Sequence, residues 1–346
     1  MSLLKSVNVF RRKFMHSITK NIGNSAKVAD RPFDPTKKVR RVLVTRPNHR
    51  LGNLLLITPL IQEIENIFPD AKVDIFIKGG LGPIIFKNYS SIGLIIALPK
   101  KHFKALGTYL KGWLKLKKNQ YDLVINVEKG SSSGRLSAQF ANSRHYFFGD
   151  ADTLSTEDQH IARYPVINLR KYLYNIGVEF PKMPVPLLDL KLDETEIKHG
   201  KALLDNIILN QKKTISIFTF ATGSKCYSEQ WWDSCYATLQ ENFADYNIVE
   251  ILPVENVSQI NFRAPSFYSK DVREIGSVIA NTAVFIGADS GIMHLASAVH
   301  TPTIGLFTVS NLHKYGPYGN GSIAIDTNNE RFLDAIISSV RNVLWQ

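Results

Sequence analysis

A turn of small polar residues after an apolar strand is the segment of this sequence best suited to chemistry. Val284 to His294 reads VFIGADSGIMH, so Asp289, Ser290 and Gly291 lie between a β-branched run and the start of a predicted helix. Such a turn presents backbone N–H groups at a helix N-terminus, where a diphosphate is stabilised. Two ordinary roles remain open, because Asp289 or Ser290 could be a helix N-cap and His294 a core residue.

Short apolar strands alternating with helices must position this turn. Strands are predicted at Val39 to Thr45, Lys72 to Ile77, Leu94 to Ala97, Asp122 to Val127, Thr214 to Phe220, Asn247 to Leu252, Ala283 to Gly287 and Thr303 to Phe307. The apolar periodicity between them predicts helices, among others at Leu54 to Phe68, Asp193 to Leu209, Val272 to Ala280 and Arg331 to Trp345. This alternation indicates an α/β protein with parallel, doubly wound sheets.

The length of 346 residues predicts two domains, and a proline-rich passage, Phe180 to Pro186 (FPKMPVP), divides them. We predict a basic N-terminal leader, an N-terminal acceptor-side domain, a linker, a C-terminal nucleotide-sugar-binding domain and a closing helix, at residues 1–38, 39–180, 181–190, 191–330 and 331–346. Ligands of doubly wound sheets bind outside the carboxyl ends of the strands, so the cleft is expected between the domains.

The composition excludes several classes of protein. Hydrophobic residues make up 44% and charged residues 21% of the chain, which argues against disorder and against a fibrous fold. Cys226 and Cys235 are the only cysteines, too few for a disulfide framework or a four-cysteine zinc site. The N-terminus lacks the apolar core and cleavage site of a secretory signal, so a reducing compartment is expected.

Positive charge is concentrated in two segments of a chain whose formal net charge is +12. Residues 1–41 contain eleven lysines and arginines and only two acids, and Pro99 to Lys118 contains seven lysines and no acid. Apolar and aromatic residues interleave with the lysines at helical spacing, as in elements that lie on anionic membranes. A solvated helix face is the alternative, and the sequence shows no nucleic-acid-binding module.

Two motifs, about 230 residues apart, resemble glycosyltransferase family 9, which includes the lipopolysaccharide heptosyltransferases. The signature D-[ST]-G-x-x-H-x-A, with its downstream proline, aLfG and GP elements, is matched by Asp289 to Ala296, Pro302, Gly305 to Phe307 and Tyr315 to Pro317. The family's first strand-to-helix loop and its F-P-x-A are matched by Arg50 to Pro59 (RLGNLLLITP) and Phe68 to Ala71. Both halves of the chain therefore carry the resemblance.

The resemblance implies a GT-B architecture, in which two doubly wound, Rossmann-like domains face a central cleft. It implies transfer of a sugar to a lipid-anchored lipopolysaccharide core or a related cell-surface glycan. The expected sugar is heptose, and the expected donor is ADP-heptose. An inverting, metal-independent reaction without a cofactor is expected, since the sequence shows no clustered His/Asp ligand set. The expected location is the bacterial cytoplasm, peripheral on the inner face of the inner membrane, with no nucleic-acid partner.

The resemblance also implies which residues bind the donor. The residues at the matching positions are Thr222, Gly223, Ser224, Lys225, Glu255, Asp289, Ser290, Gly291 and His294. Lys225 would neutralise the negative charge that develops on the departing nucleotide, although a surface lysine without a role is the alternative. Glu255 would hold a ribose or sugar hydroxyl.

One position departs from the family pattern. The first loop of the family contains Gly-Asp, and that aspartate is its presumed base, whereas this chain has Asn53 there. An amide cannot accept a proton at neutral pH, so Asn53 is expected only to orient the acceptor. His49, in the same loop, and Glu128, at the end of the strand Asp122 to Val127, are the candidate replacement bases.

Two other functions compete with the transferase. A noncatalytic or altered-activity relative that binds nucleotide sugar is consistent with Asn53. A nucleotide-sugar epimerase would share the two-lobed architecture, but the first and last loops favour the transferase.

Overall fold

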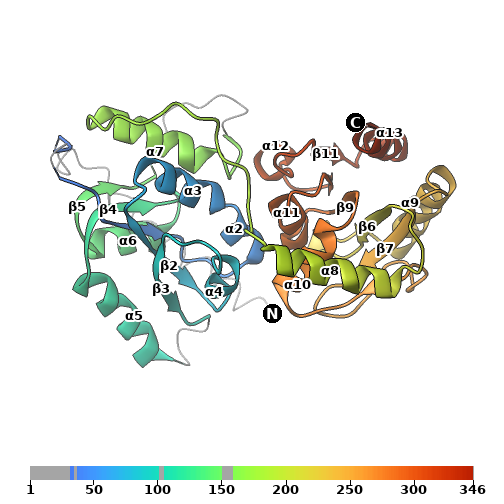
Figure 1. The fold of residues 1–346 in the computed structure, drawn as a ribbon, viewed down its shortest axis with the longest axis horizontal. Helices are drawn as coiled ribbons and strands as arrows, with labels where there is room; N and C mark the ends of the chain where they lie inside the picture. Colours follow the sequence, from blue (N-terminus) through green and yellow to red (C-terminus); the bar gives the residue numbers. More distant parts are fainter. Residues whose placement is uncertain (1–31, 35–36, 101–104, 150–158, 346) are drawn as a thin grey trace.

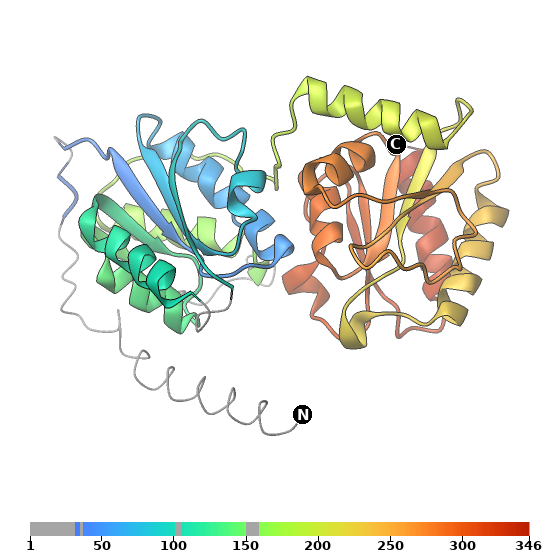
Figure 2. The ribbon, with the colours of Figure 1, turned by 90° about the horizontal axis from the view of Figure 1, so that it is seen from below.

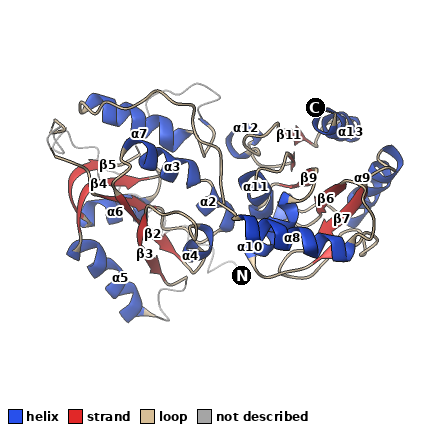
Figure 3. Ribbon diagram, viewed as in Figure 1, coloured by secondary structure: helices blue, strands red, loops and turns tan. Residues whose placement is uncertain are grey.

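The computed structural model describes residues 32–34, 37–100, 105–149 and 159–345. They form two α/β domains that lie side by side (Figure 1). In each domain, strands form a central sheet and helices cover it (Figure 3). The predicted fold of two doubly wound domains is therefore confirmed, whereas the predicted leader, residues 1–38, falls almost entirely outside the described residues. Among those described, no helix has the length and apolar character needed to cross a membrane.

The sheet of the first domain has the order β3-β2-β1-β4-β5 in the described part of the chain, with every neighbouring pair parallel. Its strands are β1 (Arg41–Thr45), β2 (Lys72–Lys78), β3 (Ile92–Leu98), β4 (Gln120–Asn126) and β5 (Asn142–Phe147). Its helices are α2 (Leu51–Leu55), α3 (Thr58–Ile67), α4 (Gly82–Ile85), α5 (Leu106–Lys118), α6 (Ser132–Phe140) and α7 (Tyr164–Asn175). In β1, Val42 and Val44 pack with α3 and α7, while Leu43 faces α5 and α6, as the alternation of a strand requires.

The single helix predicted over Leu54 to Phe68 is wrong, because two helices, α2 and α3, occupy this segment. Pro59 has no backbone N–H to donate to the carbonyl of Leu55, and the residue before a proline is disfavoured in the helical region. The hydroxyl of Thr58 instead donates to that carbonyl at 2.7 Å. The break frees α2 to point toward the second domain (Figure 1).

The sheet of the second domain has the order β11-β10-β9-β6-β7-β8 within the described residues, again parallel throughout. Its strands are β6 (Thr214–Phe218), β7 (Asn247–Ile251), β8 (Ser266–Phe267), β9 (Val284–Ala288), β10 (Thr303–Phe307) and β11 (Ile323–Asp326). Its helices are α8 (Glu194–Ile207), α9 (Glu229–Asn242), α10 (Val272–Ala280), α11 (Gly291–Ala298), α12 (Leu312–Tyr315) and α13 (Phe332–Leu344). Buried side chains of α8, α10 and α11 cover one face, and those of α9 and α13 cover the other.

An extended segment before α8 connects the domains and contacts both. From the first domain, the side chains of Gln62 and Tyr89 donate to the carbonyls of Leu187 and Asp189 at 2.8 and 2.7 Å. The backbone N–H of Leu190 donates to a carbonyl at the end of α11 at 2.7 Å. Figure 2 shows this segment crossing from one domain to the other and leading into α8.

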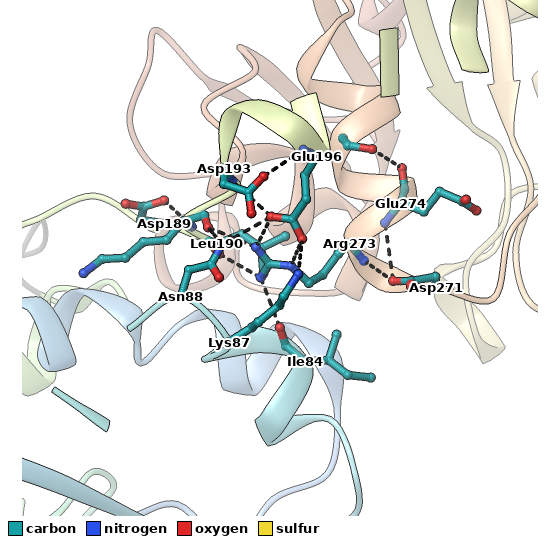
Figure 4. A network of polar contacts seen from close by, with 12 residues as sticks. Ile84, Lys87, Asn88, Asp189, Leu190, Asp193, Glu196, Asp271, Arg273 and Glu274 are labelled. Atoms are coloured by element: carbon teal, nitrogen blue, oxygen red, sulfur yellow. Dashed lines mark hydrogen bonds and ion pairs between the residues drawn. The ribbon is translucent and has the colours of Figure 1, made fainter. Parts of the chain in front are cut away.

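A buried arginine on α10 joins the two domains beside this connection (Figure 4). Arg273, which is 6% exposed, donates through Nη1 to the carbonyls of Ile84 and Leu190, both at 3.1 Å. Its Nε and Nη2 donate to the carboxylate of Glu196 at 2.6 and 2.7 Å, and Lys87 Nζ contacts the same carboxylate at 3.0 Å. The hydrogen bonds from Arg273 hold the pKa of Glu196 well below its usual value, against the opposing effect of burial.

Candidate functional site

The loops that carry most of the predicted site residues follow strands at the centres of the two sheets. Successive strands are added in one direction from β1 and in the other from β4 in the first sheet, and likewise from β6 and from β9 in the second, so each sheet has its switch point there. Asn53 follows β1, Glu128 follows β4, Lys225 follows β6 and Asp289 follows β9. Residues of all four loops line one cleft between the domains, with a volume of about 920 Å³.

Most of the predicted site residues line this cleft. They are Asn53, Glu128, Thr222, Lys225, Glu255, Asp289, Ser290, Gly291 and His294. Gly223 and Ser224 lie beside it, in the short 3₁₀ helix η3 (Gly223–Lys225), but they are not among its lining residues. His49 is exposed and also outside the lining set. The structure thus brings the candidate donor and acceptor groups together, while their roles stay predictions.

Two glycines allow the domains to approach each other at the base of the cleft. A Cβ atom on Gly52 of α2 would lie 2.7 Å from Cδ2 of His294, and one on Gly291 of α11 would lie 3.1 Å from Cβ of Leu51. The N-terminal turn of α11 therefore meets α2 almost backbone to backbone. Any larger residue at position 52 would displace the histidine ring.

The donor-side turn combines a helix N-terminus with an ion pair. Ser290 is the N-cap of α11, since its hydroxyl accepts from the N–H of Met293 at 3.3 Å. Lys225 Nζ lies 2.5 Å from Oδ2 of Asp289, whose side chain is 8% exposed. The capping role considered for Ser290 is thus present together with a lysine at the mouth of the turn, an arrangement suited to phosphate groups.

His294 is a buried histidine with an unmet hydrogen-bonding atom. Its Nδ1 has no partner among the described residues, and the side chain is 4% exposed. Burial lowers the pKa of His294 to about 4, helped by His160 and Lys225 and opposed by Asp289. The ring is therefore neutral at physiological pH and can exchange a hydrogen bond with a ligand, without contributing a charge.

The acceptor side contains an ion pair that sequence reasoning missed. Arg46, directly after β1, is 6% exposed and forms an ion pair with Glu128 through Nη1. Its Nη2 donates to Oδ1 of Asn53 at 3.2 Å, while its Nε has no partner among the described residues. The side chain of Glu128 is 42% exposed toward the cleft. Arg46 thus connects the amide at the family's aspartate position to a nearby carboxylate.

Comparisons with known proteins agree with this geometry. The model of glycosyltransferase family 9 (heptosyltransferase) matches residues 270–334, which include the whole Asp289 to His294 turn. Lipopolysaccharide heptosyltransferase 3 of Escherichia coli is 22% identical over 296 residues, covering 79% of this chain and 85% of that protein. The chain is thus similar to glycosyltransferase family 9. It is heptosyltransferase-like, as the two sequence motifs predicted.

Solved structures show that this chain has the GT-B fold. A glycosyltransferase family 9 protein from Veillonella parvula aligns with a TM-score of 0.71 at 17% identity, covering 89% of this chain and 98% of that one. A heptosyltransferase of Escherichia coli, solved with ADP, aligns with a TM-score of 0.64 at 15% identity, covering 88% and 99%. The predicted fold class is confirmed over both domains.

Further polar residues line the cleft without having been predicted as site residues. They are Asn48, Arg50, Ser269, Lys270 and Tyr315, in addition to Arg46. The signal for Arg46 was its place at the carboxyl end of the first strand, where ligands of such sheets bind. Lys270 precedes Asp271, the N-cap of α10, and nothing in its local pattern distinguishes it from a surface lysine.

A smaller hollow of about 550 Å³ lies on the linker side and includes Asp189, Lys191 and His300, but none of the predicted site residues. In the part of the chain that the structure describes, no three His, Cys, Asp or Glu side chains come together as a potential metal site.

Proposed function

We propose that this glycosyltransferase moves a heptose from ADP-heptose onto a lipopolysaccharide core or a related cell-surface glycan. One observation carries the proposal: the family's donor turn on α11 and its first loop at α2 line the same cleft, from opposite domains. The donor assignment is supported by the family's description and by the ADP bound to the solved Escherichia coli heptosyltransferase. The proposed donor and acceptor halves of the site would therefore face one another.

On the donor side, Lys225 and the N-terminus of α11 would hold the diphosphate. Cleavage of the glycosidic bond leaves extra negative charge on the departing nucleotide, and a positioned ammonium group together with helix N–H groups stabilises that charge. Neutral His294 would exchange a hydrogen bond with the donor through its unpartnered Nδ1. Glu255, which also lines the cleft from the second domain, would accept from a ribose or sugar hydroxyl.

On the acceptor side, we assign the base to Glu128. The proton of the attacking hydroxyl needs an acceptor, and the amide of Asn53 cannot supply one. Glu128 lines the cleft and is held beside Asn53 by Arg46, which contacts both. His49 is the weaker candidate because it is not a lining residue. Asn53 would then orient the acceptor while Glu128 takes the proton.

The reaction we propose is a single displacement without a metal ion. Direct attack of the acceptor hydroxyl on the anomeric carbon inverts its configuration, whereas retention requires two successive displacements. Lys225 would supply at the diphosphate the positive charge that a metal ion supplies in other transferases. The anomeric configuration of the product, read from its NMR coupling constants, and the rate in the presence of EDTA test these two points.

The acceptor would be lipid-anchored, and the protein would work peripherally on the inner face of the inner membrane. The net charge of +12 supports contact with anionic lipids and with phosphorylated core sugars.

Two experiments with the purified protein test the proposed function. First, thermal unfolding is measured with ADP, GDP, UDP and CDP, and ADP is expected to raise the midpoint most, because a ligand that binds only the folded state stabilises it. Second, turnover of ADP-heptose is measured with core acceptors. ADP binding without turnover on any acceptor would favour the noncatalytic relative that Asn53 suggests. Epimerisation of the sugar without transfer would favour the second alternative.

Replacing Asn53 by aspartate tests how the acceptor side is built. If Glu128 is the base, Asn53→Asp should change the transfer rate by less than about fivefold, because the new carboxylate would compete with Glu128 for Arg46 rather than add a function. The measurement is the single-turnover rate at saturating donor. A hundredfold gain would instead mean that the natural protein is a weakened transferase.

A further inference from the structure

Helix α5 presents a row of leucines to solvent. Leu106, Leu110 and Leu114 are 56%, 61% and 62% exposed and follow one another at intervals of four residues. Residues four apart lie on one side of a helix, so the three side chains form a continuous stripe. Single exposed apolar residues are common on proteins, but an aligned row of three large ones is a feature that needs a partner.

These leucines are not needed to pack α5 onto its own domain. The opposite side of the helix does that, through Leu116, which is fully buried, and Trp113, whose ring meets Phe76 at 5.5 Å between centroids. Gly112 brings the helix close to the sheet, since a Cβ there would lie 2.7 Å from Cδ2 of Leu98. The buried side is therefore complete without the leucines.

A half-exposed aromatic ring and four exposed lysines lie on or beside the same helix. Phe140 of α6 is 39% exposed and contacts Trp113 edge to face, and Lys117 Nζ lies 5.8 Å from the centre of the Phe140 ring. Lys111, Lys115 and Lys118 are also exposed. The helix contains no acidic residue. We call Leu106, Leu110, Leu114, Phe140 and these four lysines the α5 face.

We infer that the α5 face seats on an anionic bilayer, with its leucines inserted at the boundary between headgroups and acyl chains. Helices that lie in a membrane interface combine an apolar stripe with flanking lysines. The lysine stems can extend along the apolar surface and place their ammonium groups among lipid phosphates. A groove on a protein partner would bury the leucines equally well, but the surplus of positive charge favours a continuous anionic surface.

The position of α5 suits this role. The helix follows β3 and runs antiparallel to the strands, so its first residues lie at the sheet edge that carries the cleft loops. Figure 1 shows α5 at the outer edge of the first domain, away from the second, where a planar surface can reach it. The inference rests on the proposed function in one respect: an inserted α5 would bring the acceptor side of the cleft to a lipid-anchored acceptor.

Vesicle flotation tests the inference with the full chain. The triple variant Leu106→Ser, Leu110→Ser, Leu114→Ser should lose at least tenfold in partitioning onto vesicles of phosphatidylglycerol and phosphatidylethanolamine, because serine removes the inserted surface but leaves every charge. Lys111→Glu with Lys115→Glu should lose binding mainly at low salt, since exposed charges are screened at about 0.5 M. Leu209→Ser, at a leucine that is 89% exposed elsewhere, and Lys198→Glu with Lys212→Glu are the matched controls and should bind as the wild type does.

Insertion itself is read from a fluorescent probe. In a Cys226→Ser background, an NBD dye on Leu110→Cys or Leu114→Cys should shift to the blue and brighten on anionic vesicles, while the same dye on Leu209→Cys should not. Equal flotation of the triple serine variant, or attachment without a spectral change at 110 and 114, would overturn the inference. The probe remains informative if the triple variant does not fold.

A soluble acceptor separates this inference from the proposed function. With a deacylated acceptor, the leucine variants should transfer sugar at the wild-type rate. With the acceptor in vesicles, they should be slower by about the same factor as their binding falls. Absence of transfer to the soluble acceptor by the wild type would count against the proposed function and leave the flotation result intact.

Discussion

Two buried arginines, one beside the linker and one in the cleft, are equally shielded from solvent. They differ in how completely their hydrogen bonds are satisfied and in how exposed their glutamate partners are. Arg273 and Arg46 are each 6% exposed. Every nitrogen of the Arg273 guanidinium donates to a protein oxygen, and its partner Glu196 has a side chain that is only 17% exposed. Arg46 leaves Nε without a partner among the described residues, and the side chain of Glu128 is 42% exposed.

This difference separates a group that maintains the architecture from a group prepared for a ligand. A buried charge is tolerated when its hydrogen bonds are complete, and the Arg273 network is complete without any other molecule. In the cleft, the carboxylate of Glu128 stays accessible, and Nδ1 of His294 has no hydrogen-bond partner within the described part of the chain. Polar groups whose hydrogen bonds are not all made within the protein, at the carboxyl ends of the strands, are places where a substrate can replace water.

Removing the carboxylate of the cleft pair should give the largest effect. Glu128→Gln is expected to lower the transfer rate by roughly 10²–10⁴, the usual contribution of a general base, and to leave ADP affinity unchanged. The single-turnover rate and calorimetric titration of ADP measure the two quantities. Glu229→Gln, at an exposed position on α9, is the control. A loss of this size in His49→Ala, with Glu128→Gln active, would reverse the assignment.

The next effect concerns folding. Arg273→Met should lower the free energy of unfolding by about 3–5 kcal/mol, since it leaves the carboxylate of Glu196 without its main partner in a mostly buried place. Arg46→Met should cost only about 1–2 kcal/mol, because the exposed Glu128 can be hydrated, and should lower the transfer rate instead. Urea unfolding measures both. Equal destabilisation by the two substitutions would contradict the distinction between the networks.

A smaller effect is expected in donor binding. Lys225→Ala should weaken ADP-sugar binding by about 1.5–3 kcal/mol, the range for a charge-assisted hydrogen bond. Part of this loss should come from Asp289, which would face the diphosphate without its counter-ion, so the double variant with Asp289→Asn should recover some affinity. Calorimetric titration of the wild type, the two single variants and the double variant measures these affinities, with Lys212→Ala as the control. Unchanged affinity in the single variant would remove Lys225 from the donor site.

At neutral pH the smallest effect comes from His294, whose influence on stability appears only as the solution is acidified. The unfolded chain binds a proton at this residue near pH 6.5, whereas the folded protein does so only near pH 4. The free energy of unfolding therefore has its full value with respect to this group above pH 6.5. It declines as the pH falls toward 4, by at most about 1.4 kcal/mol per pH unit. His294→Gln should flatten urea-derived stability across this window. An unchanged slope would show that the imidazole is not desolvated as its burial indicates.

The sequence by itself determined the fold class and pointed to most of the residues that the second domain contributes to the cleft. β-branched strands such as Thr303 to Phe307 and the apolar periodicity of Val272 to Ala280 predicted elements with the observed bounds, because local patterning dominates in buried strands and amphipathic helices. The turn from Asp289 to His294 was found because its N-cap Ser290, Gly291 and His294 lie close together in the chain. Edge strands such as Asn142 to Phe147 were missed, since their half-exposed side chains give no apolar run.

Only the tertiary structure decided how distant groups combine. Arg46 and Glu128 are 82 residues apart, and no local pattern connects them; parallel pairing of β1 with β4 places both strand ends side by side. Likewise, Arg273 meets Glu196 and Ile84 because α8, α10 and α4 pack at the junction of the domains. Whether a polar group is buried, and whether all its hydrogen bonds are made, depends on residues that only folding brings together. For that reason the sequence could suggest Glu128 as a base, but only packing could supply the arginine that holds it beside Asn53.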